Sequence, residues 1–305
     1  MIKLGPLFII LAALMWAFDG VLRRSLFSLA PIIIVFYEHF LGALILLPAS
    51  LKTILKTKIT KNQWLAFLWV SIASGVLGTL WFTTALVKTE FIPFSVVFLL
   101  QKLQPLFAII AARLLLKESL PRNYLLWAGI AIIAAFFVTF PNGSINFTNN
   151  PQQISAALFS IGAAFAWGSS TAFSRYLLIK LSHTVVTAMR FLLTTFFAFP
   201  LVFILNSQSQ LTTINGSQLT MLLMITFSTG LFALWIYYQG LKRTPAKIST
   251  ILELTFPVTA VAIDIVLYKS VLIPSQYLSA IILMAAIFFI SRQTNNNQPF
   301  NRLTD

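Results

Sequence analysis

Six side chains that could bind a polar ligand lie inside long apolar stretches of the sequence. They are Glu38, His39, Gln101, Lys102, Arg190 and Glu253. A charged group at bilayer depth costs ~3 kcal/mol or more unless it is paired or hydrated. We therefore expect these residues to face a common cavity and to contact a substrate or a proton.

The chemistry of these residues allows two interpretations. Lys102 and Arg190 suit an anionic group such as a carboxylate, because both side chains donate charged hydrogen bonds. Glu38 or Glu253 suits an amine or a coupling proton, and His39 is of the residue type whose unperturbed pKa lies near neutrality. In the alternative interpretation, Glu38–Lys102 and Arg190–Glu253 are structural ion pairs that hold helices together.

Aromatic side chains form the second group of candidates. Trp16 and Trp167 lie about twelve to thirteen residues into their apolar runs, away from the interface where tryptophan usually collects. A central indole can form a flat wall for an apolar or aromatic substrate, or it can pack between helices. Trp81, Trp235 and Tyr238 complete the predicted lining.

The sequence lacks the residues that most enzymes and metal sites need. It has no cysteine, no His-Glu-x-x-His, no Gly-x-Ser-x-Gly and no phosphate-binding loop with lysine. We therefore predict no catalytic residue, no metal site and no cofactor. An ATP-driven pump is excluded for this chain alone, whereas an intramembrane enzyme or a channel remains an alternative.

The composition places these residues in a membrane protein. Of the 305 residues, 58% are hydrophobic and only 9% are charged, too few charges for the polar surface of a soluble domain. Because a spanning helix needs about 20 mostly apolar residues, the sequence predicts an all-α integral membrane protein of ten transmembrane helices. The runs are Leu4–Leu22, Pro31–Pro48, Gln63–Val87, Pro93–Leu116, Tyr124–Phe140, Ile154–Leu178, Thr184–Leu205, Gln218–Leu241, Ala246–Tyr268 and Pro274–Ile290.

Basic residues in the connections predict the orientation. With the N-terminus inside, fifteen lysines and arginines lie on the inner side and four, Arg23, Arg24, Lys88 and Lys269, lie outside. Cytoplasmic loops carry this excess, so both termini should face the cytoplasm. The short loops favour a bacterial plasma membrane. We expect the lipid bilayer and a small-molecule substrate as partners and no nucleic acid, while the oligomeric state stays open.

The two halves of the sequence resemble each other. The segment from Ala13 to Ala17 matches the segment from Ala164 to Gly168, and in the same register His39 meets Arg190. Further on, Pro105 matches Pro257. Since five spans precede five similar spans, the halves must point in opposite directions. Inverted repeats of this kind are typical of secondary transporters, whose substrates bind near the midplane.

The motifs also resemble those of a known family. Ala-x-x-Trp-[Ala/Gly] occurs in both halves, Leu99-Leu100-x-x-x-x-Pro105 returns as Ile251-Leu252-x-x-x-x-Pro257, and Leu114-Leu115-Leu116-Lys117-Glu118 ends the fourth run. In this order the motifs resemble the EamA family of the drug/metabolite transporter superfamily. The resemblance implies a ten-helix transporter of metabolites with a central cavity.

These observations predict a domain organisation and a function. We expect a first five-helix repeat at 1–141, an outer linker at 142–153, a second repeat at 154–291 and a disordered cytoplasmic tail at 292–305. The chain should move a small polar or amphipathic metabolite, such as an amino acid, by alternating access, and as an exporter. A metabolite importer or exchanger is the alternative.

Overall fold

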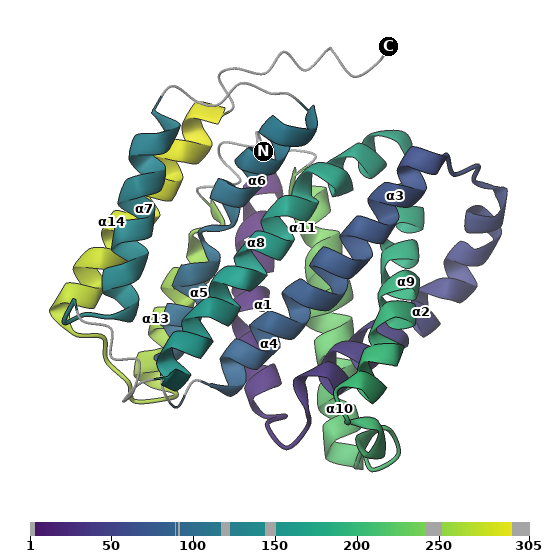
Figure 1. Cartoon of the computed structure of the whole chain (residues 1–305). Coiled ribbons are helices and arrows are strands. Elements are labelled where there is room, and N and C mark those ends of the chain that lie inside the picture. The colour runs from purple at the N-terminus through teal and green to yellow at the C-terminus, as the bar shows by residue number, and fades with distance from the viewer. Residues whose placement is uncertain are drawn as a thin grey trace.

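The computed structural model describes residues 4–88, 90, 92–116, 123–143, 151–241 and 252–294, and these ranges contain helices and no strand (Figure 1). The α-helices are α1 (Leu4–Arg24), α2 (Pro31–Lys56), α3 (Lys61–Trp69), α4 (Thr79–Val87), α5 (Phe94–Gln101), α6 (Gln104–Leu116), α7 (Tyr124–Thr139), α8 (Pro151–Lys180), α9 (His183–Ile204), α10 (Gly216–Met224), α11 (Ala233–Leu241), α13 (Thr255–Val266) and α14 (Pro274–Thr294). Two π-helical segments, η1 (Val70–Gly78) and η3 (Ile225–Phe232), and a 3₁₀ turn, η2 (Gln208–Leu211), complete the set.

Several helices of the described part of the chain are long and apolar enough to cross a membrane. Six qualify by length and hydropathy: Gly5–Arg24, Pro31–Lys56, Lys61–Val87, Phe94–Ala111, His183–Ile204 and Gly216–Tyr237. Three further apolar helices, Tyr124–Thr139, Thr255–Val266 and Pro274–Ile290, are shorter. Helix α8 is the longest of the described helices, with 30 residues. Helix makes up most of the described part of every predicted apolar run, so the all-helical fold is confirmed. The number of spans stays a prediction.

Local sequence explains why equivalent helices start where they do. At the start of α3, the Thr60 hydroxyl accepts from the Gln63 backbone N–H while the Gln63 side chain accepts from Thr60 N. At the start of α10, Asn215 and Gln218 form the same reciprocal pair. Such capping boxes satisfy two backbone donors that a helix start leaves unpaired. The two halves therefore begin their third helix with the same device.

Both halves also interrupt their helices at matching places. The segments η1 and η3 occupy corresponding positions, between α3 and α4 in one half and between α10 and α11 in the other. A turn at Lys102 and Leu103 separates α5 from α6 just before Pro105, and a turn at Glu253 and Leu254 precedes α13 and Pro257. Proline removes a backbone donor and clashes with the preceding turn, so the breaks follow from the sequence.

The first helix of each half packs against helices of the other half. Helix α2 packs along α9, and α7 packs along α14 at the other edge of the bundle (Figure 1). Between these pairs, α1 packs on α11, η3 and α13, while α8 packs on α3, η1, α4 and α6. Each half thus inserts its first helix between the third and fourth helical segments of the other half.

The boundaries differ from the sequence prediction at several points, among them the end of α2, which continues past the predicted Pro48 to Lys56. Helix α1 continues to Arg24, so Arg23 belongs to a helix rather than to an outer connection. Helix α14 continues to Thr294, into the predicted tail, whose residues 295–305 lie outside the described residues. Helix α8 begins at Pro151, and residues 144–150 of the predicted linker also lie outside the described residues.

Candidate functional site

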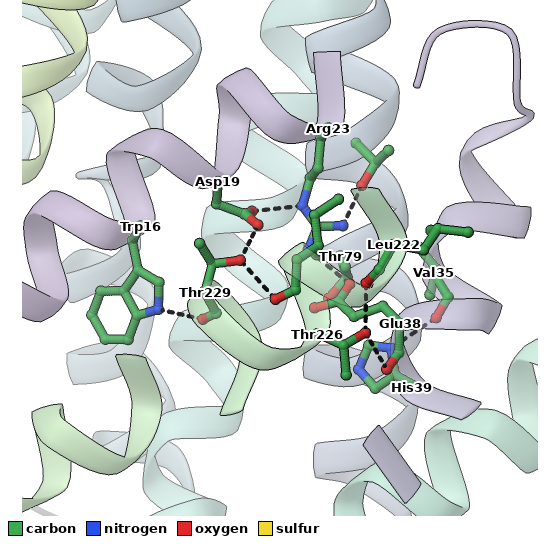
Figure 2. A network of polar contacts seen from close by, with 12 residues as sticks. Trp16, Asp19, Arg23, Val35, Glu38, His39, Thr79, Leu222, Thr226 and Thr229 are labelled. Carbon is green, nitrogen blue, oxygen red and sulfur yellow. Dashed lines mark hydrogen bonds and ion pairs between the residues drawn. The ribbon is translucent and has the colours of Figure 1, made fainter. Parts of the chain in front are cut away.

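A buried ionic cluster of Asp19, Arg23 and Glu38 joins α1 to α2 (Figure 2). Arg23 Nε donates to Asp19 Oδ2 at 2.6 Å, and its terminal nitrogen donates to Glu38 Oε2 at 2.7 Å. A third bond, of 3.3 Å, runs to the Thr83 hydroxyl on α4. Since Arg23 is only 4% exposed, these bonds replace its hydration and stabilise a charge that would otherwise be costly to bury.

The ionic cluster also contacts the second half of the chain. The Thr229 hydroxyl, on η3, donates to Asp19 Oδ1, and the Thr226 hydroxyl lies 3.4 Å from the Glu38 carbonyl oxygen. The Trp16 indole donates to the Thr229 carbonyl oxygen at 3.1 Å (Figure 2). Two residues of η3, Thr226 and Thr229, thus bond to α2 and α1 respectively.

His39 and Arg190 lie beside this cluster. His39 is 3% exposed, its Nδ1 lies 2.9 Å from the Val35 carbonyl oxygen, and its ring packs on Phe191 with centroids 5.1 Å apart. Arg190 is close enough to interact electrostatically with both Glu38 and His39. The structural ion pair Glu38–Lys102, which the sequence offered as an alternative, is wrong. Within the described ranges Glu38 forms its ion pair with Arg23.

A second group, here called the central cluster, gathers at the two helix breaks. It comprises Trp16, Lys102, Tyr237, Glu253 and Phe256. The Tyr237 hydroxyl donates to Glu253 Oε1 at 2.7 Å, and the Tyr237 ring lies 5.1 Å from the Trp16 ring. Lys102 Nζ lies 4.8 Å from the centre of the Phe256 ring, near enough to Glu253 for their charges to attract.

Exposure distinguishes the two clusters. Asp19, Arg23 and Glu38 are each buried, whereas Trp16, Lys102, Tyr237 and Glu253 are each partly exposed. Gln101, next to Lys102, is 4% exposed, and its Nε2 has no hydrogen-bond partner among the described residues. The central cluster therefore combines a cation, an anion, a hydroxyl and aromatic faces that a ligand can reach.

The remaining predicted residues lie elsewhere. The Trp167 indole donates to the Ser74 carbonyl oxygen at 3.0 Å, which repeats in the other half the bond from Trp16 to a π-segment carbonyl. Trp81 packs against α8, where a Cβ on Gly162 would lie 2.9 Å from its ring. Trp235 is 51% exposed and stacks on Phe232. The side chain of Tyr238 lies outside the described part of the chain.

The sequence prediction did not place Arg23 or Thr229 in a site. One signal was available for Arg23, because Asp19 and Arg23 are four residues apart and so lie on the same face of a helix. Nothing local marks Thr229. In the described ranges no group of three or more His, Cys, Asp or Glu side chains could hold a metal ion.

Comparison with known proteins gives matches over nearly the whole chain. The profile of the EamA-like transporter family matches residues 3–140 and 154–292. The riboflavin transporter ImpX of Fusobacterium nucleatum is 37% identical over 291 residues, covering 94% of this chain and 97% of its own length. A crystal structure with 16% identity superposes with a TM-score of 0.62, covering 96% of this chain and 99% of that one. That last likeness concerns the fold alone.

Proposed function

The chain belongs to the EamA-like transporter family, and from this premise we propose that it carries riboflavin or a close flavin analogue across the membrane by alternating access. The chain is a transporter and not an enzyme, in keeping with its family. The flavin substrate is taken from the name of the relative that is 37% identical. The central cluster supplies the chemical support.

The central cluster suits the flavin ring system. The ring system is planar and aromatic, with an imide edge that has two carbonyl acceptors and one N–H donor. The Trp16 and Tyr237 rings pack on each other with centroids 5.1 Å apart and an angle of 53° between their planes, so a flat ring would stack on the outer face of one of them. Lys102 donates hydrogen bonds and Glu253 accepts them, which complements the imide edge. This juxtaposition of partly exposed rings with one cation and one anion is the observation that supports the proposal.

We further propose the architecture that the sequence predicted. Ten spans form two inverted five-helix repeats, 1–141 and 154–291, in a bacterial plasma membrane with both termini in the cytoplasm. The matched capping boxes, π-segments and proline breaks support the repeat. The exchanged packing of α1 and α8 supports a two-fold relation between the halves.

The direction of transport is a separate part of the proposal. The family resemblance led us to expect export, with import or exchange as the alternative. We propose that the flavin gradient sets the net direction. Efflux and uptake should then both occur in the same preparation.

Counterflow in proteoliposomes tests the substrate. Purified protein is reconstituted, the vesicles are loaded with unlabelled riboflavin, and the entry of labelled riboflavin is followed. We expect saturable uptake that internal riboflavin accelerates, and a loss of about tenfold or more in initial rate for Lys102→Met and Glu253→Gln. Lys88→Met, at a lysine bonded to Gln152 away from the central cluster, is the matched control.

Amino acids form the competing substrate class, because Lys102 and Glu253 together could hold a zwitterion. Saturable amino-acid uptake without riboflavin counterflow would refute the flavin proposal. It would favour the amino-acid substrate that the sequence led us to expect. Unsaturable flux would indicate a channel. If both variants transport riboflavin at the normal rate and equal expression, the central cluster is not the binding site.

A further inference from the structure

Thr229 is bonded to both clusters. Its backbone carbonyl oxygen accepts from the Trp16 indole in the central cluster, and its hydroxyl donates to Asp19 in the ionic cluster (Figure 2). It is 6% exposed and lies on η3, in the second half of the chain, whereas Trp16 and Asp19 both lie on α1. A single residue therefore joins the partly exposed aromatic face to the buried charges.

The Thr229 hydroxyl has a second acceptor within reach. A hydroxyl carries one proton, and the Thr229 oxygen lies 3.0 Å from the Ile225 carbonyl oxygen of its own helix as well as beside Asp19. Thr226 has the same arrangement, with Leu222 O at 2.8 Å and Glu38 O at 3.4 Å. If α1 separates from η3, the Thr229 hydroxyl keeps the Ile225 carbonyl oxygen as its acceptor, so this donor is not left unsatisfied.

The ionic cluster has no charged counterpart in the second half. In the register that aligns Trp16 with Trp167, Asp19 meets Ser170, Arg23 meets Ser174 and Glu38 meets Met189. The Ser170 hydroxyl donates to Ala166 O within its own helix. The positions in the second half that are equivalent to the ionic cluster therefore carry no charge.

We propose that Thr229 is the positioning residue that couples substrate binding at Trp16 to a gate between α1 and η3, where Asp19 of the ionic cluster accepts from the Thr229 hydroxyl. The coupling rests on the proposed flavin function, whereas the gate does not. Separation of α1 from η3 breaks the Thr229–Asp19 bond and moves the Trp16 indole away from its carbonyl partner. A ligand that stacks on Trp16 therefore biases the gate, because both contacts lie on one residue.

Substitution at Thr229 tests this coupling. Thr229→Val keeps the shape and the backbone carbonyl but removes the hydroxyl, and Thr229→Ser keeps the hydroxyl. Thr195→Val is the matched control, because the Thr195 hydroxyl donates to Phe191 O in its own helix, on α9. The chain has no cysteine, so spin labels at Ser25→Cys and Thr220→Cys, both exposed, report the separation of α1 from α10 without background.

The distance distribution is measured in reconstituted full-length protein with and without riboflavin. Without ligand, Thr229→Val should raise the ratio of separated to closed molecules by about fivefold or more, and Thr229→Ser and Thr195→Val should match the wild type. Riboflavin should change that ratio in the wild type and in Thr229→Ser but not in Thr229→Val. The Kd of Thr229→Val for riboflavin, measured by flavin fluorescence, should stay within about twofold of the wild-type value.

Each outcome decides one part of the proposal. A Thr229→Val protein that behaves like the wild type in both conditions overturns the coupling. Equal effects of Thr229→Val and Thr229→Ser overturn it as well, because packing rather than the hydroxyl would then be responsible. If the wild type does not bind riboflavin, the proposed function fails, and the ligand-free comparison of the two variants still decides whether Thr229 holds the gate.

Discussion

Replacement of Arg23 by methionine tests whether the ionic cluster is as buried as the structure shows. Met keeps the apolar stem but removes the bonds to Asp19 at 2.6 Å and to Glu38 at 2.7 Å. Two carboxylates, on residues 8% and 6% exposed, then remain without their cation. We expect a large loss of stability, because a buried charge without a partner cannot recover its hydration.

The magnitude follows from the two bonds. Removal of one partner from a buried ion pair costs about 3–5 kcal/mol, and the Phe82 ring, 5.9 Å from the guanidinium, adds less than about 1 kcal/mol. At about 2 °C per kcal/mol for a chain of this size, Arg23→Met should melt about 8 °C below the wild type. Tryptophan fluorescence in detergent follows the unfolding, since the chain has 7 tryptophans.

Two further variants control this experiment. Arg24→Met removes the neighbouring arginine, which lies over the Tyr268 ring at 3.8 Å, and should cost only about 2 °C. The triple variant Asp19→Asn, Arg23→Met, Glu38→Gln removes all three charges and should recover most of the lost stability. A decrease below about 2 °C for Arg23→Met, or a triple variant no more stable than the single one, would refute the reasoning.

Three other predictions test the site, the packing and the topology. Trp16→Ala should weaken riboflavin binding about tenfold, whereas Trp235→Ala should leave the Kd within about twofold; equal effects would contradict the placement of the two rings. Gly42→Ala should lower stability by about 1–3 kcal/mol, because the added Cβ overlaps a ring of α9, and an unchanged melting temperature would argue against the close packing of α2 on α9. Cysteines at Lys56 and Gln210 should react with impermeant reagents from opposite sides of the membrane, and labelling from one side would rule out inverted repeats.

Much of the architecture follows from local features of the chain. Runs of about 20 apolar residues identify membrane helices, and Pro105 and Pro257 mark the breaks at which Lys102 and Glu253 lie. Glu253 and Lys102 were both expected to face a shared site, and the structure brings them within electrostatic range. Trp235 was expected to line it as well, but it lies two residues from Tyr237, about 200° around the helix, and is 51% exposed.

Membrane insertion depends on residues that are close along the chain, so hydropathy was enough to predict it. The partners of Arg23 depend on how helices pack. Asp19 is 4 residues away from it, but Glu38 is 15 and Thr83 is 60, and Thr229 reaches Asp19 across 210 residues. An arginine near a helix end can be hydrated at the surface or buried against acids, and its own sequence neighbourhood is the same in both cases. Only the packing of α1 against α2 and α4 brings Glu38 and the Thr83 hydroxyl to Arg23, and only its packing against η3 brings Thr229 to Asp19, since those contacts join segments with no local relation to one another.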